Sequence, residues 1–181
     1  MVEDLIKTLK SAFEARVNMR LGSTHPVVLW LVEYASVLLS KYSVGNDGRT
    51  TYQKLHGKRA HEKLVEFGEK VLYFIPKAKR AKLDKRFGVG VFLGRALWGD
   101  ENYIARADGT VIRTQGLARM SPKLSWDSKW FKDIKGTPND MMSSGEANEI
   151  ETSAAPHAQK YTDLDNKLMR TLVLRAEFLT L

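Results

Sequence analysis

Basic side chains are concentrated in one short stretch of the 181-residue sequence. Ammonium and guanidinium groups neutralise nucleic-acid phosphates and release their counterions without reading base sequence. A dense cluster of such groups therefore has the chemistry of a phosphate-binding surface. We predict that the cluster contacts nucleic acid, the alternative being a solvated loop with no partner. The residues are Lys77, Lys79, Arg80, Lys82, Lys85 and Arg86.

The charge of the whole chain favours a polyanionic partner. The formal net charge is +8 at pH 7, and the isoelectric point is about 9.6. Between positions 58 and 95, eleven Lys or Arg accompany four acids, whereas positions 137–157 contain four acids and no Lys or Arg. The excess positive charge thus belongs to the middle of the chain, and a solvating linker is expected after it.

Patterns typical of other catalytic or metal sites are absent from the sequence. Without Cys there can be no disulfide, thiolate nucleophile or Cys-based zinc site. No Ser-His-Asp set, phosphate-binding loop or dinucleotide fingerprint occurs. The histidines lack the paired spacing of zinc ligands, and His25, which precedes Pro26, is expected to cap or pack at a helix start. They are His25, His56, His61 and His157.

Short strands are the elements that would position the basic cluster. Apolar alternation and turn signals predict strands at 70–75, 87–94, 102–107 and 110–117, with a hairpin turn at Asp108-Gly109. The basic cluster would then occupy the loop between the first two strands. Strands this short and this closely spaced describe a small barrel.

Glycines and aromatic residues within these strands have a simple packing interpretation. Gly88 and Gly90 would leave room on one face of a sharply bent strand. Alternation places Tyr73, Phe74 and Phe92 in the core, and base stacking is the alternative for these rings.

Helices are predicted on both sides of the barrel. The spacing of apolar residues predicts an amphipathic helix at 3–21, an almost wholly apolar helix at 27–42 and a short capped helix at 50–57. After Met120, aromatic residues at helical spacing could dock a last turn onto the barrel. Positions 136–159 are predicted to be disordered, and a helical period returns at 161–181. The docking residues are Trp126, Trp130 and Phe131.

Read in order, several motifs resemble the C-terminal part of a copia-type retrotransposon integrase, a component of a Pol polyprotein. They are V-E-D-L-I-K-T-L, H-P-V-V-L-W, R-T-T-Y-Q-K-L-H-G-K-R-A, E-F-G-E-K-V-L-Y-F-I-P, K-L-D, V-F-L-G and the D-G hairpin, between Val2 and Met120. The resemblance implies an α+β chain in which the end of an RNase H-like catalytic core precedes an SH3-like barrel. The first two parts that it implies are 1–57 (helical core remnant) and 58–120 (barrel). Composition and periodicity add 121–160 (linker, largely disordered) and 161–181 (C-terminal helix), and the tail beyond Pro138 resembles no known family.

The resemblance also implies a role for Glu3. Integrases hold two Mg²⁺ or Mn²⁺ ions with two Asp and one Glu for phosphodiester strand transfer, and Glu3 falls on the position of that Glu. Asp4 and Ile6 depart from the family, which usually has Arg and Asn there. The two partner aspartates would lie before Met1, and one carboxylate cannot hold two hard cations. We therefore expect Glu3 to be a vestigial metal ligand or a first-turn acid at the helix dipole, with no cofactor and no strand transfer for this chain alone.

The expected function is nucleic-acid binding in the context of DNA integration by a truncated, catalytically incomplete integrase. The alternatives are a non-enzymatic protein-interaction module and a decayed open reading frame. The resemblance implies that the apolar helix at 27–42 would pack on a sheet that this chain lacks, and an exposed apolar patch there would favour self-association. No apolar run is long enough to span a membrane, and Glu3 and Asp4 do not suit a signal peptide. A soluble, intracellular protein of the nucleus or cytoplasm is expected.

Overall fold

The computed structural model describes residues 2–76, 81–97, 99 and 101–141. The chain divides into two compact units, Met1–Gly136 and Thr137–Leu181. In the second unit the described residues are 137–141, where the Thr137 backbone N–H donates a hydrogen bond to Asp140 Oδ2 at 2.6 Å and helical backbone begins at 138. The rest of the predicted linker and the predicted helix at 161–181 lie outside the described residues.

The first helix, α1 (Val2–Val17), ends four residues earlier than predicted. Its buried face includes Phe13 and Val17, as the four-residue spacing predicted. The helix stops because Asn18 adopts a left-handed conformation with φ of 52°, which Asn tolerates better than most residues. The Glu14 carboxylate then accepts a hydrogen bond from the Leu21 backbone N–H at 2.7 Å and holds the turn that follows.

The next two helices begin and end close to where the sequence predicted. At the start of α2 (Pro26–Tyr42), His25 Nδ1 accepts a hydrogen bond from the Val27 backbone N–H at 3.2 Å. The expected capping role of His25 is therefore confirmed. α3 (Thr51–His56) begins at a Thr50 cap and ends at Gly57, whose left-handed φ of 69° suits a residue without a Cβ.

The strands form one antiparallel sheet, which confirms the α+β class. They are β1 (Lys70–Phe74), β2 (Phe87–Arg95), β3 (Asn102–Ala105), β4 (Val111–Thr114) and β5 (Leu117–Arg119). The order across the sheet is β4-β3-β2-β1-β5. The predicted turn at Asp108-Gly109 joins β3 to β4, where the Arg106 backbone N–H donates to Thr110 O at 2.8 Å. The predicted single strand at 110–117 was wrong, because Gln115 and Gly116 divide it into β4 and β5.

This division has a geometric consequence for the sheet. β4 and β5 lie at opposite edges, yet only Gln115 and Gly116 separate them along the chain. Three Cα–Cα steps reach at most ~11 Å, whereas edge strands four spacings apart in a flat sheet would be separated by ~19 Å. The sheet must therefore be strongly curled, and the Thr114 hydroxyl, at the end of β4, donates to Phe74 O of β1 at 3.5 Å.

The glycines of β2 have the packing role that the sequence predicted. A Cβ at Gly88 would overlap the Tyr73 ring, and a Cβ at Gly90 would overlap Ile104 and lie 2.8 Å from Ala105 O. The absence of these two side chains lets neighbouring strands and rings approach one face of β2 closely.

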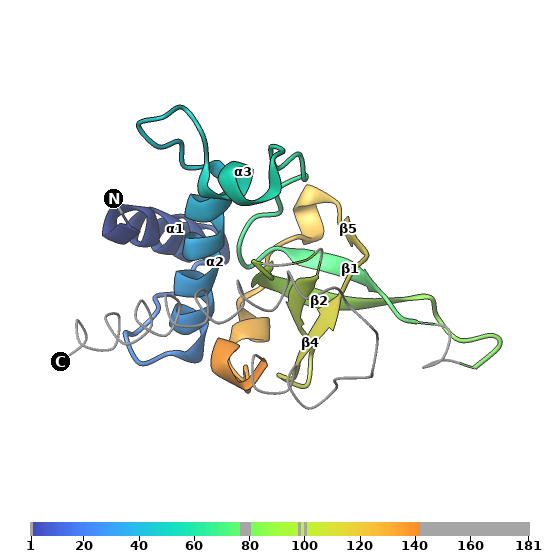
Figure 1. The fold of residues 1–181 in the computed structure, drawn as a ribbon. Helices are drawn as coiled ribbons and strands as arrows, with labels where there is room; N and C mark the ends of the chain where they lie inside the picture. The colour runs from blue at the N-terminus through green and yellow to red at the C-terminus, as the bar shows by residue number, and fades with distance from the viewer. Residues whose placement is uncertain (1, 77–80, 98, 100, 142–181) are drawn as a thin grey trace. The chain divides into compact units, whose positions relative to one another are not determined.

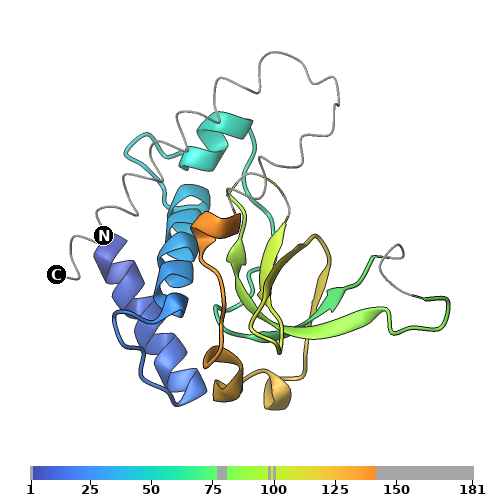
Figure 2. The ribbon, with the colours of Figure 1, turned by 90° about the horizontal axis from the view of Figure 1, so that it is seen from below.

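α1 and α2 lie beside each other on one side of the sheet (Figure 1, Figure 2). α2 contacts the sheet through two aromatic pairs: Tyr34 with Phe92, whose ring centroids are 5.5 Å apart, and Trp30 with Tyr103, at 5.2 Å. The helices and the sheet thus share a core within the first unit.

Residues 121–136, where a linker was expected to begin, are folded onto this core. They include the 3₁₀ helices η2 (Pro122–Leu124) and η3 (Ser128–Phe131). Phe131 is fully buried, and its ring lies edge-on to Phe13 with centroids 4.8 Å apart. The predicted docking of this aromatic segment is thus observed for Phe131, while Trp126 lies beneath the Arg16 guanidinium at 5.5 Å.

Candidate functional site

The predicted basic cluster belongs to the β1–β2 hairpin, which extends away from α1 and α2 (Figure 1, Figure 2). Lys82, Lys85 and Arg86 are exposed in the segment that leads into β2. The other three predicted residues, Lys77, Lys79 and Arg80, lie outside the described residues.

Backbone hydrogen bonds fix the described part of this hairpin. The Ile75 N–H donates to Arg86 O at 3.0 Å, which continues the β1–β2 pairing by one residue beyond the Phe74–Phe87 pair. The Ala81 N–H donates to Asp84 Oδ2 at 2.7 Å, and the Asp84 N–H returns a bond to Ala81 O at 3.2 Å. Asp84, the acid among residues 81–86, therefore stabilises this turn.

The remaining acids of the positive segment neutralise cations of the folded body. These pairs are Glu62 with Lys41 and Arg95, Glu66 with Arg16 and Arg119, and Glu69 with Arg119. By contrast, Lys82, Lys85 and Arg86 form no ion pair with any residue that the structure describes. Lys58, Arg59 and Lys63 in the same segment also form no ion pair with a described residue, but among these cations Lys82, Lys85 and Arg86 are the ones on the hairpin.

Two aromatic residues at the base of the hairpin are exposed. Phe74 is 41% exposed and Phe87 is 47% exposed, and their rings meet edge to face with centroids 6.0 Å apart. The prediction of a core position was therefore wrong for Phe74, because β1 and β2 run beyond the body of the sheet at that end. It was right for Phe92, which is buried against Tyr34, while Tyr73 is half-buried over Gly88.

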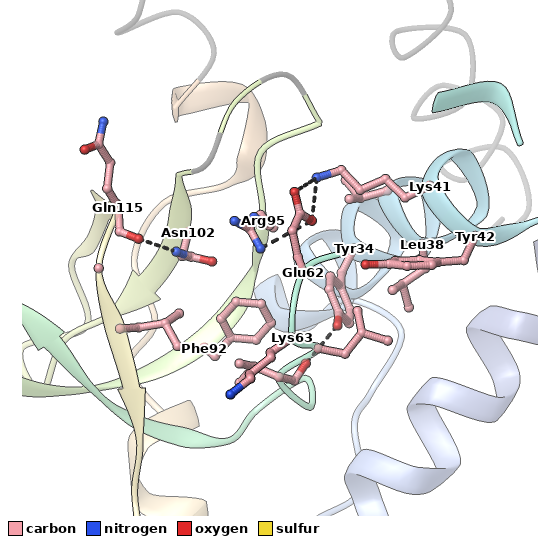
Figure 3. Close-up of a pocket in the computed structure, with 15 residues that line it drawn as sticks. Tyr34, Leu38, Lys41, Tyr42, Glu62, Lys63, Phe92, Arg95, Asn102 and Gln115 are labelled. Carbon is pink, nitrogen blue, oxygen red and sulfur yellow. Dashed lines mark hydrogen bonds and ion pairs between the residues drawn. The ribbon is translucent and has the colours of Figure 1, made fainter. Parts of the chain in front are cut away.

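A pocket of about 340 Å³ lies between α2 and the sheet (Figure 3). At its centre the Glu62 carboxylate accepts hydrogen bonds from Lys41 Nζ at 3.0 and 3.2 Å and lies 3.3 Å from an Arg95 guanidinium nitrogen. Lys41 is buried although it carries a charge. The Glu62 carboxylate thus joins a cation of α2 to a cation of β2. Sequence reasoning missed this cluster, because its members lie far apart along the chain.

The same pocket wall contains Tyr34, whose hydroxyl donates a hydrogen bond to Val65 O at 2.8 Å. Burial raises the pKa of this phenol above its ordinary range. The Tyr34 hydroxyl therefore joins α2 to the segment that precedes β1, and it remains protonated at neutral pH.

Glu33 is a second buried carboxyl group on α2. It is 4% exposed, and its Oε2 has no hydrogen-bond partner among the described residues. Burial raises the pKa of this carboxyl from 4.5 to about 7. Glu33 is consequently neutral over most of the acidic range and titrates near neutrality.

Glu3 lies exposed in the first turn of α1, where the helix dipole favours an acid. Within residues 2–76, 81–97, 99 and 101–141, no three His, Asp or Glu side chains lie close enough to hold a metal ion. The residues around Glu3 therefore do not fit a two-metal centre, and we derive no metal-dependent step. The predicted vestigial role of Glu3 stays a prediction.

The apolar helix α2 is largely covered within the first unit. Leu31 and Ala35 are buried, while Val28, Val32 and Leu38 are half-buried. Self-association through this helix stays a prediction, and the packing of α1 and β2 against it reduces the apolar surface available for a partner. No described helix has the length and apolar character needed to cross a lipid bilayer.

Comparison with known proteins identifies no relative of this chain. No protein-family model matches the chain, and neither the curated proteins nor the solved structures contain a significant match. The similarity to integrases consequently rests on the motifs quoted above.

Proposed function

We propose that this chain binds DNA through phosphate contacts made by the β1–β2 hairpin. The observation that carries the proposal is the exposure of Lys82, Lys85 and Arg86 on a projecting hairpin, without an ion pair to any described residue. Cations held away from the acids of the body can neutralise phosphates without first breaking an internal salt bridge. Such contacts give affinity and do not read sequence.

The proposal places this binding in an integrase-like polypeptide of a copia-type retrotransposon. The sheet order and the two-residue passage from β4 to β5 support an SH3-like barrel, because the curl brings the two edges of the sheet together. The apolar α2 and the amphipathic α1 support a remnant of an RNase H-like core. We assign no catalytic step to the residues of this chain.

Fluorescence anisotropy with a labelled DNA duplex tests the proposal. The full chain is compared with a variant carrying Lys82→Ser, Lys85→Ser and Arg86→Ser, and with a matched control carrying Lys7→Ser, Lys58→Ser and Arg59→Ser. The control removes the same number and types of charge from exposed positions outside the hairpin. Affinity should fall steeply between ~50 and ~200 mM salt, and the hairpin variant should lose up to about 3 from the slope of log K against log salt.

The control variant should keep a slope close to that of the unchanged protein. Equal slopes for the hairpin and control variants would show that binding depends on total charge, which contradicts a hairpin site. Absence of binding by the folded protein at ~50 mM salt would reject DNA binding altogether.

A further inference from the structure

Exposed rings at the base of the hairpin are not explained by phosphate binding. Phe74 and Phe87 are opposite each other in the β1–β2 register, and Val89, two residues further along β2, is 38% exposed. Side chains two positions apart on a strand share a face. Phe87 and Val89 therefore form a short apolar strip on one face of β2, and Leu83 in the turn before it is 97% exposed.

Contact with Phe74 leaves much of the Phe87 side chain exposed. The two rings are inclined by 71°, so the contact between them is edge to face. A contact of this kind covers at most one face of one ring. With 47% of Phe87 exposed, a flat apolar group can pack onto its ring, supported from the side by Phe74.

The charged residues beside this apolar strip indicate which class of partner can bind there. Lys85 and Arg86 directly precede Phe87, and Lys82 lies in the Ala81–Asp84 turn before them. The three cations accompany one acid, Asp84, whose carboxylate caps the turn. A purely apolar partner would have to desolvate these cations without compensation. A polyanion that also carries flat aromatic groups matches both features.

We propose that the hairpin binds unpaired nucleic acid, with a base stacked on Phe87 and the flanking phosphates on Lys85 and Arg86. This inference rests on the proposed function and specifies its substrate class. In a duplex the faces of the bases are covered by their neighbours, whereas an unpaired strand presents them to an aromatic side chain. Phe74 acts as a buttress that holds the Phe87 ring in place.

The test compares two single-stranded oligonucleotides of equal length and charge. One is a labelled oligo-dT, and the other is the same phosphodiester chain with abasic sites throughout its centre. Because both carry the same phosphates, their affinities differ only through the bases. We expect the oligo-dT to bind the full chain more tightly by roughly 5- to 150-fold for each stacked base.

Substitutions at Phe87 separate stacking from general apolar contact. Phe87→Leu should remove most of the preference for oligo-dT while leaving the affinity for the abasic strand unchanged, and Phe87→Tyr should retain the preference. Phe87 is exposed at the start of β2, and circular dichroism checks that each variant is folded.

The outcomes distinguish this inference from the proposed function. Equal affinity of the unchanged protein for oligo-dT and the abasic strand would overturn stacking while leaving phosphate binding intact. A preference that survives Phe87→Leu would overturn the role of the ring. If neither strand binds at ~50 mM salt, the proposed nucleic-acid function itself fails.

Discussion

Burial of one carboxyl group couples the folding of this protein to pH at the scale of a single residue. The pKa of Glu33 is raised by burial from 4.5 to about 7, so the folded state holds a proton that the unfolded state has released. The contribution of Glu33 to the free energy of unfolding must therefore fall as pH rises from about 4.5 to about 7, and this contribution then stays level.

Glu33→Gln tests this coupling directly. Between pH 5 and pH 8 the unchanged protein should lose roughly 2–3 kcal/mol more stability than the variant, since Gln does not ionise. Urea unfolding of both proteins at the two pH values measures the difference. Parallel losses of stability in the two proteins would contradict the raised pKa.

The features that could not be predicted from single residues depend on contacts between parts of the chain that are distant in sequence. Lys41, Glu62 and Arg95 meet in one pocket only because α2 and the sheet pack together. Phe74 has the alternation of a core residue, yet it is exposed, because periodicity identifies a face and not how far the neighbouring elements cover it. The cap at His25, by contrast, depends on adjacent residues and was predicted correctly.

At the scale of elements, helices and strands were predicted well where local signals are strong. The Asp108-Gly109 turn and the Thr50 and Gly57 caps are examples, because each is determined by neighbouring backbone geometry. The end of α1 at Asn18 and the break at Gln115-Gly116 were not predicted. In both cases polar residues or Gly change the chain direction within a stretch whose apolar period continues.

The strand β2 provides a matched test of close packing. Gly90→Ala should destabilise the protein by about 1–3 kcal/mol, because the new Cβ meets Ile104 and lies 2.8 Å from the Ala105 carbonyl oxygen. Gly22→Ala, where nothing lies within 4 Å of the added Cβ, should change stability by less than about 0.5 kcal/mol. Thermal unfolding monitored by circular dichroism compares the two, and equal effects would contradict the packing argument.

At the scale of the whole molecule, the described acids of the positive segment that form ion pairs do so with cations outside the hairpin. Glu62, Glu66 and Glu69 pair with cations of the helices and the sheet. Lys82, Lys85 and Arg86 stay exposed on the hairpin. The basic cluster could be predicted from the sequence, because charged residues that are close together in the chain stay close in any fold. Its isolation from the acids could not be predicted, because ion pairs such as Arg119 with Glu69 join residues far apart in sequence.

The measurement that tests DNA binding by the hairpin most directly is lysine acetylation of the full chain, read by mass spectrometry with and without saturating duplex DNA. Lys82 and Lys85 should lose most of their reactivity when DNA is bound, because their ammonium groups contact phosphates. Lys7 and Lys58, which are exposed outside the hairpin, should react equally in both conditions. Unchanged reactivity of Lys82 and Lys85 under saturating DNA, or protection of Lys7 and Lys58 instead, would contradict the proposed site.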